Sequence, residues 1–132
     1  MKQMTVIAQD KVGMIADISY ILGAAKINID SVMAVSSEGK AILTFLLKDG
    51  ERAARLLEHN GYNVLESEIF LIRLKDEPGE LSKVSTLLGE KKVNIASLYV
   101  VARDKGNSIV ALKVDKPRKA KKLLAPFMKM EE

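Results

Sequence analysis

Three residue types that could bind a small charged molecule recur along this chain at one fixed spacing. The sequence D-x-x-G is followed by Asn fifteen positions after the Gly, from 13 to 28 and again from 79 to 94. A carboxylate accepts hydrogen bonds from an ammonium group, and the free amides at a helix start favour a carboxylate. A loop that offers a carboxylate together with free helix amides can bind both charges of a zwitterion. We therefore expect Asp, Gly and Asn to gather at one end of each repeat.

Each of these side chains also has a structural explanation that needs no ligand. Asp before a helix can cap the first helical amides. Asn after a helix can satisfy the backbone of a turn. Gly supplies the conformational freedom that a tight turn requires. The recurrence of all three residues together favours a ligand site.

The repeat extends well beyond these residues. Residues 10–35 align with residues 76–101 without a gap and share ten identities. A weaker match continues in the same ungapped register from Leu46/Leu112 to Leu57/Leu123. Apolar residues at spacings of three and four predict an amphipathic helix after the D-x-x-G element of each copy.

Both copies predict the element order strand, helix, strand, strand, helix, strand. In the first copy the remaining elements are strands at about residues 4–9, 27–37, 40–48 and 62–66 and a helix at 50–61. In the second copy they are strands at about residues 69–74, 93–103, 107–114 and 128–132 and a helix at 116–124. The segments "EG" and "DKGN" predict hairpin turns. The last strand follows Pro126, so we expect it to be short, at a sheet edge or absent.

This order indicates an α+β fold. We expect two ferredoxin-like βαββαβ repeats, each an antiparallel sheet with both helices on one face. The predicted domains are residues 1–66 and 67–132.

The composition is that of a globular protein without recognisable catalytic apparatus. The 132 residues include no cysteine and a single histidine, His59, which is expected to be solvated or to cap a helix end. The N-terminal apolar run is too short for a signal peptide, and no stretch approaches the ~20 apolar residues of a membrane span. We therefore expect a cytoplasmic protein that is not an enzyme and has no catalytic residue, metal ion or cofactor.

Positive charge is concentrated in the second copy. Residues 67–132 carry fourteen Lys and Arg against nine Asp and Glu, a net charge of +5, whereas residues 1–66 carry seven against eight, a net charge of −1. The segment "KPRKAKK" could contact a nucleic acid or a membrane, or could be a solvated helix face. The solvated face is favoured because no aromatic residue is interleaved for base stacking.

The segments "DEPGELSKVSTLLGEKKVNIASLYV" and "DKVGMIADISYILGAAKINIDSVMAV" each resemble an ACT domain, the small regulatory module attached to many enzymes of amino-acid metabolism. The resemblance implies amino-acid binding where two such modules meet. The implied ligand-binding residues are Asp10, Lys11, Val12, Gly13, Met14, Asn28, Asp76, Glu77, Pro78, Gly79, Glu80 and Asn94. Val12 replaces the usual Pro, so we rank the second copy's site first.

The resemblance further implies a stand-alone regulatory protein that senses a free amino acid, forms a homodimer and acts on a metabolic enzyme. Two other functions remain open. One is a structural oligomerisation module whose strand edges pair with another copy. The other is an RNA-binding ferredoxin-like protein, for which the expected strands offer few aromatic residues.

Overall fold

The computed structural model describes residues 2–128. The chain divides into two compact units, one that ends at Glu68 and one that begins at Ile69. Each unit has its own buried apolar core.

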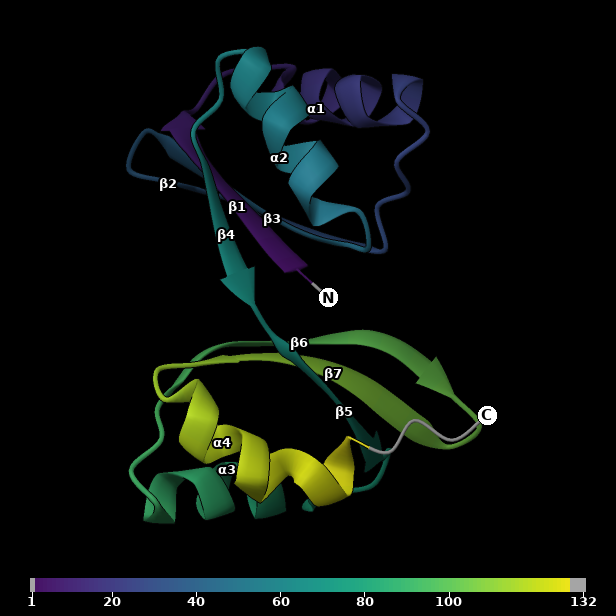
Figure 1. Ribbon diagram of the computed structural model, residues 1–132, viewed down its shortest axis with the longest axis vertical. Coiled ribbons are helices and arrows are strands. Elements are labelled where there is room, and N and C mark those ends of the chain that lie inside the picture. The colour runs from purple at the N-terminus through teal and green to yellow at the C-terminus, as the bar shows by residue number, and fades with distance from the viewer. Residues whose placement is uncertain (1, 129–132) are drawn as a thin grey trace. The chain divides into compact units, whose positions relative to one another are not determined.

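The first unit follows the expected βαββαβ order. Its elements are β1 (Lys2–Gln9), α1 (Met14–Ala24), β2 (Ser31–Ser37), β3 (Lys40–Leu47), α2 (Gly50–His59) and β4 (Val64–Glu68). The strands pair antiparallel in the order β2-β3-β1-β4. Both helices cover the same face of this sheet, so the predicted ferredoxin-like arrangement is confirmed (Figure 1).

Helix periodicity and strand alternation explain the core of the first unit. Ile18 and Leu22, four residues apart on α1, are fully buried against Met4, Val6 and other alternate residues of the sheet. Burial of each such side chain contributes about 1.5–3 kcal/mol. This packing holds α1, and with it the loop before α1, over the sheet.

The second unit repeats the same order up to its second helix. Its elements are β5 (Phe70–Lys75), α3 (Glu80–Glu90), β6 (Ile95–Asp104), β7 (Asn107–Val114), α4 (Pro117–Leu124) and a short 3-10 helix, η1 (Ala125–Phe127). Within the described residues its sheet has three antiparallel strands in the order β5-β7-β6. The predicted fourth strand at 128–132 lies outside the described residues except for Met128, which follows η1.

Both predicted hairpin turns are present. Glu38 and Gly39 have φ values of 51° and 78°, and Lys105 and Gly106 have φ values of 50° and 77°. Positive φ at both central residues defines the two-residue turn that matches the natural twist of a hairpin.

The ladder between β6 and β7 has register shifts at Ile95/Ser97 and at Val100/Ala102, and the second of these adds a residue relative to β2. Val100 pairs with Val110, but the next pair along the ladder is Ala102 with Ile109. Val101 is therefore an unpaired bulge residue, and β2 has no bulge at the corresponding position. From this point on, equivalent residues of the two units differ by 67 positions instead of 66.

The bulge corrects the ungapped alignment. Leu57 of α2 is fully buried, and so is Leu124 of α4, whereas Leu123 is only partly buried. The predicted pairing of Leu57 with Leu123 is wrong by one residue. For the same reason Arg103, and not Ala102, takes the place of Ser36 at the end of the strand.

Candidate functional site

The loop between β1 and α1 has the shape that its glycine allows. Gly13 immediately precedes α1 with a φ of 89°, in the left-handed region. A Cβ at this position would meet no heavy atom within 4 Å, so backbone conformation and not crowding requires glycine here. Gly79 before α3 has the same φ of 89°.

Neither helix start is capped by a side chain. The N-cap positions are Gly13 and Gly79, and among residues 2–128 no side chain accepts a hydrogen bond from the first amides of α1 or α3. The capping explanation for Asp10 and Asp76 therefore does not hold. The first amides of α1 remain available to an anion, which the helix dipole also favours.

Asp10 is positioned by the β2–β3 hairpin. Its backbone N–H donates to the Gly39 carbonyl at 2.9 Å, and its Oδ2 accepts a hydrogen bond from the Ser36 hydroxyl. In the described part of the chain Asp10 forms no ion pair with a lysine or arginine. Its carboxylate is thus oriented by neutral groups and keeps its charge available for a cation.

A hollow of about 430 Å³ opens beside this loop. It lies among the β1–α1 loop, the first turn of α1 and the facing parts of β2 and β3. The lining residues are Asp10, Lys11, Gly13, Met14, Ile15, Ala16, Ala34, Val35, Ser36, Ala41 and Leu43. The lining thus combines charged and hydrogen-bonding groups with apolar side chains from α1, β2 and β3.

Two predicted residues of the first unit lie outside this hollow. Val12 is fully exposed, and Asn28 lies in the loop after α1. Asn28 lines a separate hollow of about 160 Å³, and its side-chain amide donates to Asp30 at 2.9 Å. The eleven residues of α1 separate Asn28 from Gly13, a helix rise of ~16 Å. The expectation that Asp, Gly and Asn gather at one end of the unit is wrong.

The corresponding hollow of the second unit is smaller and differently charged. Its volume is about 140 Å³, and Asp76, Glu77 and Glu80 line it together with residues of β5, β6 and β7. Asp76 Oδ2 lies 3.3 Å from the Arg103 guanidinium. Of the other predicted residues, Pro78 and Gly79 belong to the same loop but do not line the hollow.

Glu80 is the first residue of α3 and brings a carboxylate to the helix start. Its side chain is only 17% exposed and lies 2.6 Å from the Lys83 ammonium. The hydrogen bond from Lys83 to Glu80 and the charge of Glu80 raise the pKa of Lys83 above its ordinary value. The first turn of α3 therefore carries a carboxylate of the chain itself, which is paired with a lysine.

Asn94 takes part in a turn on the far side of α3. Its backbone N–H donates to Asp115 Oδ1 at 2.9 Å, and its carbonyl accepts from the Asp115 N–H at 3.1 Å. Like Asn28, it is separated from the glycine of its copy by a whole helix. In this unit too, the recurring Asn lies apart from the Asp.

Sequence reasoning missed the residues that β2 and β3 bring to the first hollow. Ser36 is the clearest case, because its hydroxyl orients Asp10 across 26 positions of sequence. The only sequence signal for Ser36 is the predicted hairpin between β2 and β3. Ser36 lies just before the turn of this hairpin and pairs with Ala41, which pairs in turn with Ala8 near the end of β1.

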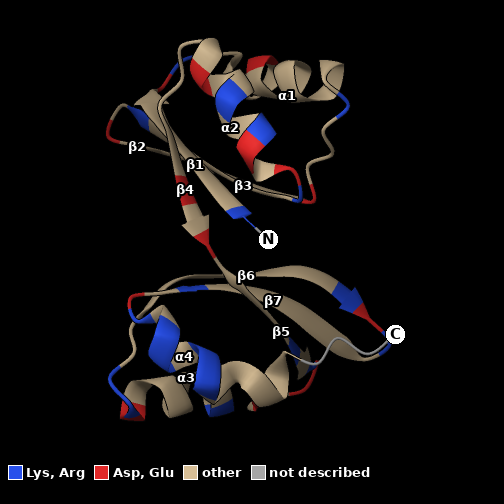
Figure 2. Ribbon diagram, viewed as in Figure 1, with Lys and Arg blue, Asp and Glu red and all other residues tan. Residues whose placement is uncertain are grey.

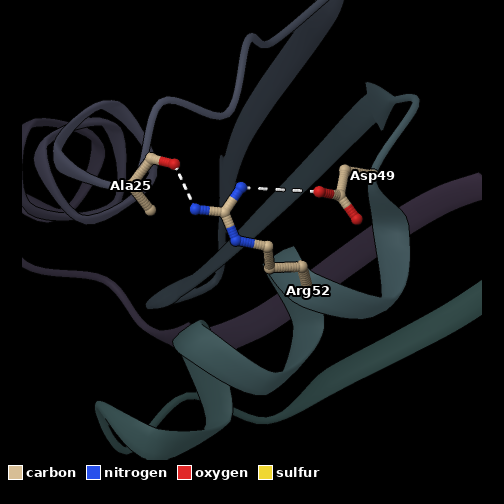
Figure 3. A network of polar contacts seen from close by, with 3 residues as sticks. All are labelled: Ala25, Asp49 and Arg52. Atoms are coloured by element: carbon tan, nitrogen blue, oxygen red, sulfur yellow. Dashed lines mark hydrogen bonds and ion pairs between the residues drawn. The ribbon is translucent and has the colours of Figure 1, made fainter.

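A second polar cluster ties the two helices of the first unit together. The Arg52 guanidinium donates to the Ala25 carbonyl at the end of α1, and its Nη1 lies 3.5 Å from Asp49 Oδ2 (Figure 3). In the second unit Lys116 donates to the Lys92 carbonyl in the same way. Because each cation serves a helix end, we interpret this cluster as structural.

The basic segment of the second copy forms the exposed side of α4 (Figure 2). Arg118, Lys119, Lys121, Lys122 and Lys91 border a shallow hollow of about 600 Å³. Leu123 is the remaining lining residue, so no aromatic ring lies among these cations. The surface offers charge for a polyanion but no platform for base stacking.

Among the described residues no helix is both long and apolar enough to cross a membrane. In the same part of the chain, His, Asp and Glu side chains nowhere converge in a group of three that could hold a metal ion.

The fold and the repeated loops define a pair of ferredoxin-like modules, each with a hollow between its first strand and first helix. The family model described as "ACT domain pair" matches residues 1–129, and the chain belongs to this family. The resemblance inferred from the D-x-x-G elements is confirmed.

Solved structures share this fold at low sequence identity. A protein from Bacteroides thetaiotaomicron is 22% identical with a TM-score of 0.86, and the match covers 95% of this chain and 86% of that one. The regulatory subunit of aspartate kinase from Thermus thermophilus, in its ligand-free form, is 16% identical with a TM-score of 0.70, covering 95% and 91%. The corresponding subunit from Thermus flavus is also 16% identical with a TM-score of 0.70, covering 94% and 88%. A search of curated proteins found no match.

Proposed function

We propose that this protein is a regulatory protein that binds a free amino acid at the β1–α1 loop of its first ACT module. One observation carries the proposal: the carboxylate of Asp10 and the uncapped start of α1 border the same hollow. The family assignment supports it, as does the likeness to proteins described as regulatory subunits of aspartate kinase.

The two charged groups of an α-amino acid match the two ends of this loop. The ligand carboxylate would accept hydrogen bonds from the first amides of α1, with the Lys11 ammonium at the same hollow. The ligand ammonium would donate to Asp10, which the Ser36 hydroxyl holds in place. Each charge-assisted hydrogen bond of this kind contributes about 1.5–3 kcal/mol.

Regulation follows if the ligand distinguishes two states of the protein. A ligand shifts an equilibrium only by its differential affinity for the two states. We propose that occupation of the loop favours one arrangement of a homodimer, and that a partner enzyme of amino-acid metabolism binds one arrangement better than the other. The family resemblance, with its implied binding between modules, is the basis of this step.

A thermal-shift screen against the twenty common amino acids tests the proposal. A ligand present at ~100 times its dissociation constant stabilises the native state by about 2.7 kcal/mol, which is readily visible as a higher melting temperature. If no amino acid shifts the melting temperature of well-folded protein, the proposed function is wrong.

The variant Asp10→Asn tests the site itself. It keeps the shape of the side chain and the hydrogen bond from Ser36 but removes the negative charge. We expect the ligand-induced shift to disappear while the unliganded melting temperature changes little. Glu38→Gln is the matched control, because it removes a charge from the adjacent hairpin without touching the hollow.

A further inference from the structure

We infer that the ligand is an amino acid with an apolar side chain, and that each chain binds it at one site only, in the first unit. This inference rests on the proposed function, because it assumes that the hollow at the β1–α1 loop receives an amino acid. It adds the class of side chain and the number of sites, neither of which the family assignment contains.

The apolar walls of the first hollow select the ligand side chain. With the two charged groups of the ligand at Asp10 and at the start of α1, its side chain lies against the remaining walls. Those walls are Met14, Ile15, Ala16, Ala34, Val35, Ala41 and Leu43, none of which has a polar side chain. The hydroxyl of Ser36 is already donated to Asp10.

A charged or strongly polar ligand side chain would lose water in this part of the hollow without gaining a hydrogen bond. Burial of an unpaired polar group is unfavourable, whereas each buried methylene group strengthens binding by about fourfold. Aliphatic and aromatic amino acids are therefore favoured over Asp, Glu, Lys, Arg and Ser.

At the start of its first helix the second unit carries a charge that would oppose the ligand carboxylate. Glu80 takes the place of Met14, which is 97% buried and forms an apolar wall. The Glu80 carboxylate lies at the first residue of α3, paired with Lys83 at 2.6 Å. A ligand carboxylate at that helix start would meet a like charge at close range.

The bulge at Val101 gives Asp76 of the second unit a cationic partner within the chain. Because of the extra residue, Arg103 occupies the position that Ser36 has in the first unit. Its Nε lies 3.3 Å from Asp76 Oδ2, so the carboxylate that would receive an ammonium group already has a cationic partner. The hollow that remains is about 140 Å³, against about 430 Å³ in the first unit.

Isothermal titration calorimetry with the full chain tests the inference. L-leucine, L-isoleucine, L-methionine and L-phenylalanine are compared with L-aspartate, L-lysine and L-serine. We expect an apolar amino acid to bind most tightly, at one molecule per chain.

Two matched pairs of variants locate the site. Ser36→Arg copies the second unit's arginine into the first, and should weaken binding at least tenfold because a cation then competes for Asp10. Ser37→Arg adds the same charge to the other face of β2 and should leave the affinity within about twofold of the wild type. Likewise Asp10→Asn should weaken binding at least tenfold, whereas Asp76→Asn should not. Circular dichroism confirms that each variant is folded.

The outcomes separate the inference from the proposed function. If a charged or polar amino acid binds best, or if two molecules bind per chain, the inference is wrong and the proposed function stands. The same conclusion follows if Asp76→Asn weakens binding as much as Asp10→Asn does. If none of the twenty amino acids binds, the proposed function fails and the inference falls with it.

Discussion

The variant Gly13→Ala isolates the backbone conformation that orients the start of α1. The added methyl group meets no heavy atom within 4 Å, so it causes no steric clash. It does force an L-residue to keep a φ of 89°. The left-handed conformation costs a non-glycine residue about 1–2 kcal/mol, so we expect the free energy of unfolding to fall by roughly that amount.

Gly23→Ala is the matched control within the same helix. Gly23 lies inside α1, and a Cβ there also meets no heavy atom within 4 Å. Its conformation is helical, so alanine should stabilise the protein by about 0.5–1 kcal/mol. Two variants that each add one methyl group to exposed positions should thus differ in stability by roughly 2 kcal/mol, with opposite signs relative to the wild type.

Urea denaturation followed by circular dichroism measures both changes. Gly79→Ala and Gly89→Ala repeat the comparison in the second unit, where Gly79 has a φ of 89° and Gly89 lies within α3. If Gly13→Ala is as stable as the wild type, or gains stability as Gly23→Ala is expected to, then Gly13 does not determine the loop conformation. Such a result would refute the placement of the free amides of α1 at the hollow by the conformation of Gly13.

Three further outcomes are expected. The hydrogen bond from the Tyr62 hydroxyl to Asp17 raises the pKa of Tyr62 to about 12. The stability that this hydrogen bond contributes is therefore present below pH ~10 and is lost as the pH rises from ~10 to ~12. Tyr62→Phe should remove this part of the pH dependence, and identical unfolding profiles for both proteins across that range would contradict it. Gly50→Ala would place a Cβ 2.7 Å from Lys2 Cβ and from Met4 Cε. This overpacking should lower the free energy of unfolding by about 1–3 kcal/mol. An unchanged melting temperature would contradict this close packing around Gly50. If α4 presents only a solvated basic face, the protein should not retain single-stranded RNA at moderate salt. An RNA-binding function would be supported if the protein retains RNA, if this retention falls steeply with salt, and if replacing the α4 lysines with glutamine abolishes it.

Local sequence patterns predicted the elements well but placed several strand starts too early, most clearly that of β2. The apolar residues Ile27 and Ile29 led to a strand from residue 27, whereas β2 begins at Ser31. Both isoleucines pack on the core from the loop after Lys26, which has a φ of 63°. Apolar character reports burial and does not distinguish a paired strand from a buried loop.

The ranking of the two sites shows the limit of reasoning from the loop alone. The proline in "DEPG" favours the second copy, but the larger hollow lies in the first, where Asp10 has no ion pair with a described residue. The reason is the bulge at Val101, which moves Arg103 next to Asp76. No glycine or other turn residue in "SLYVVAR" indicates that extra residue.

By itself the sequence determined the two repeats, the order of their elements and the need for glycine at positions 13 and 79. These features depend on local periodicity and on the backbone preferences of single residues, which can be recognised without knowing the fold. Only the tertiary structure decided that Ser36 orients Asp10, that Arg103 pairs with Asp76 and that the whole of α1 separates Asn28 from Gly13. Those contacts join residues more than 25 positions apart, and they depend on the pairing register of strands, which a single residue can shift.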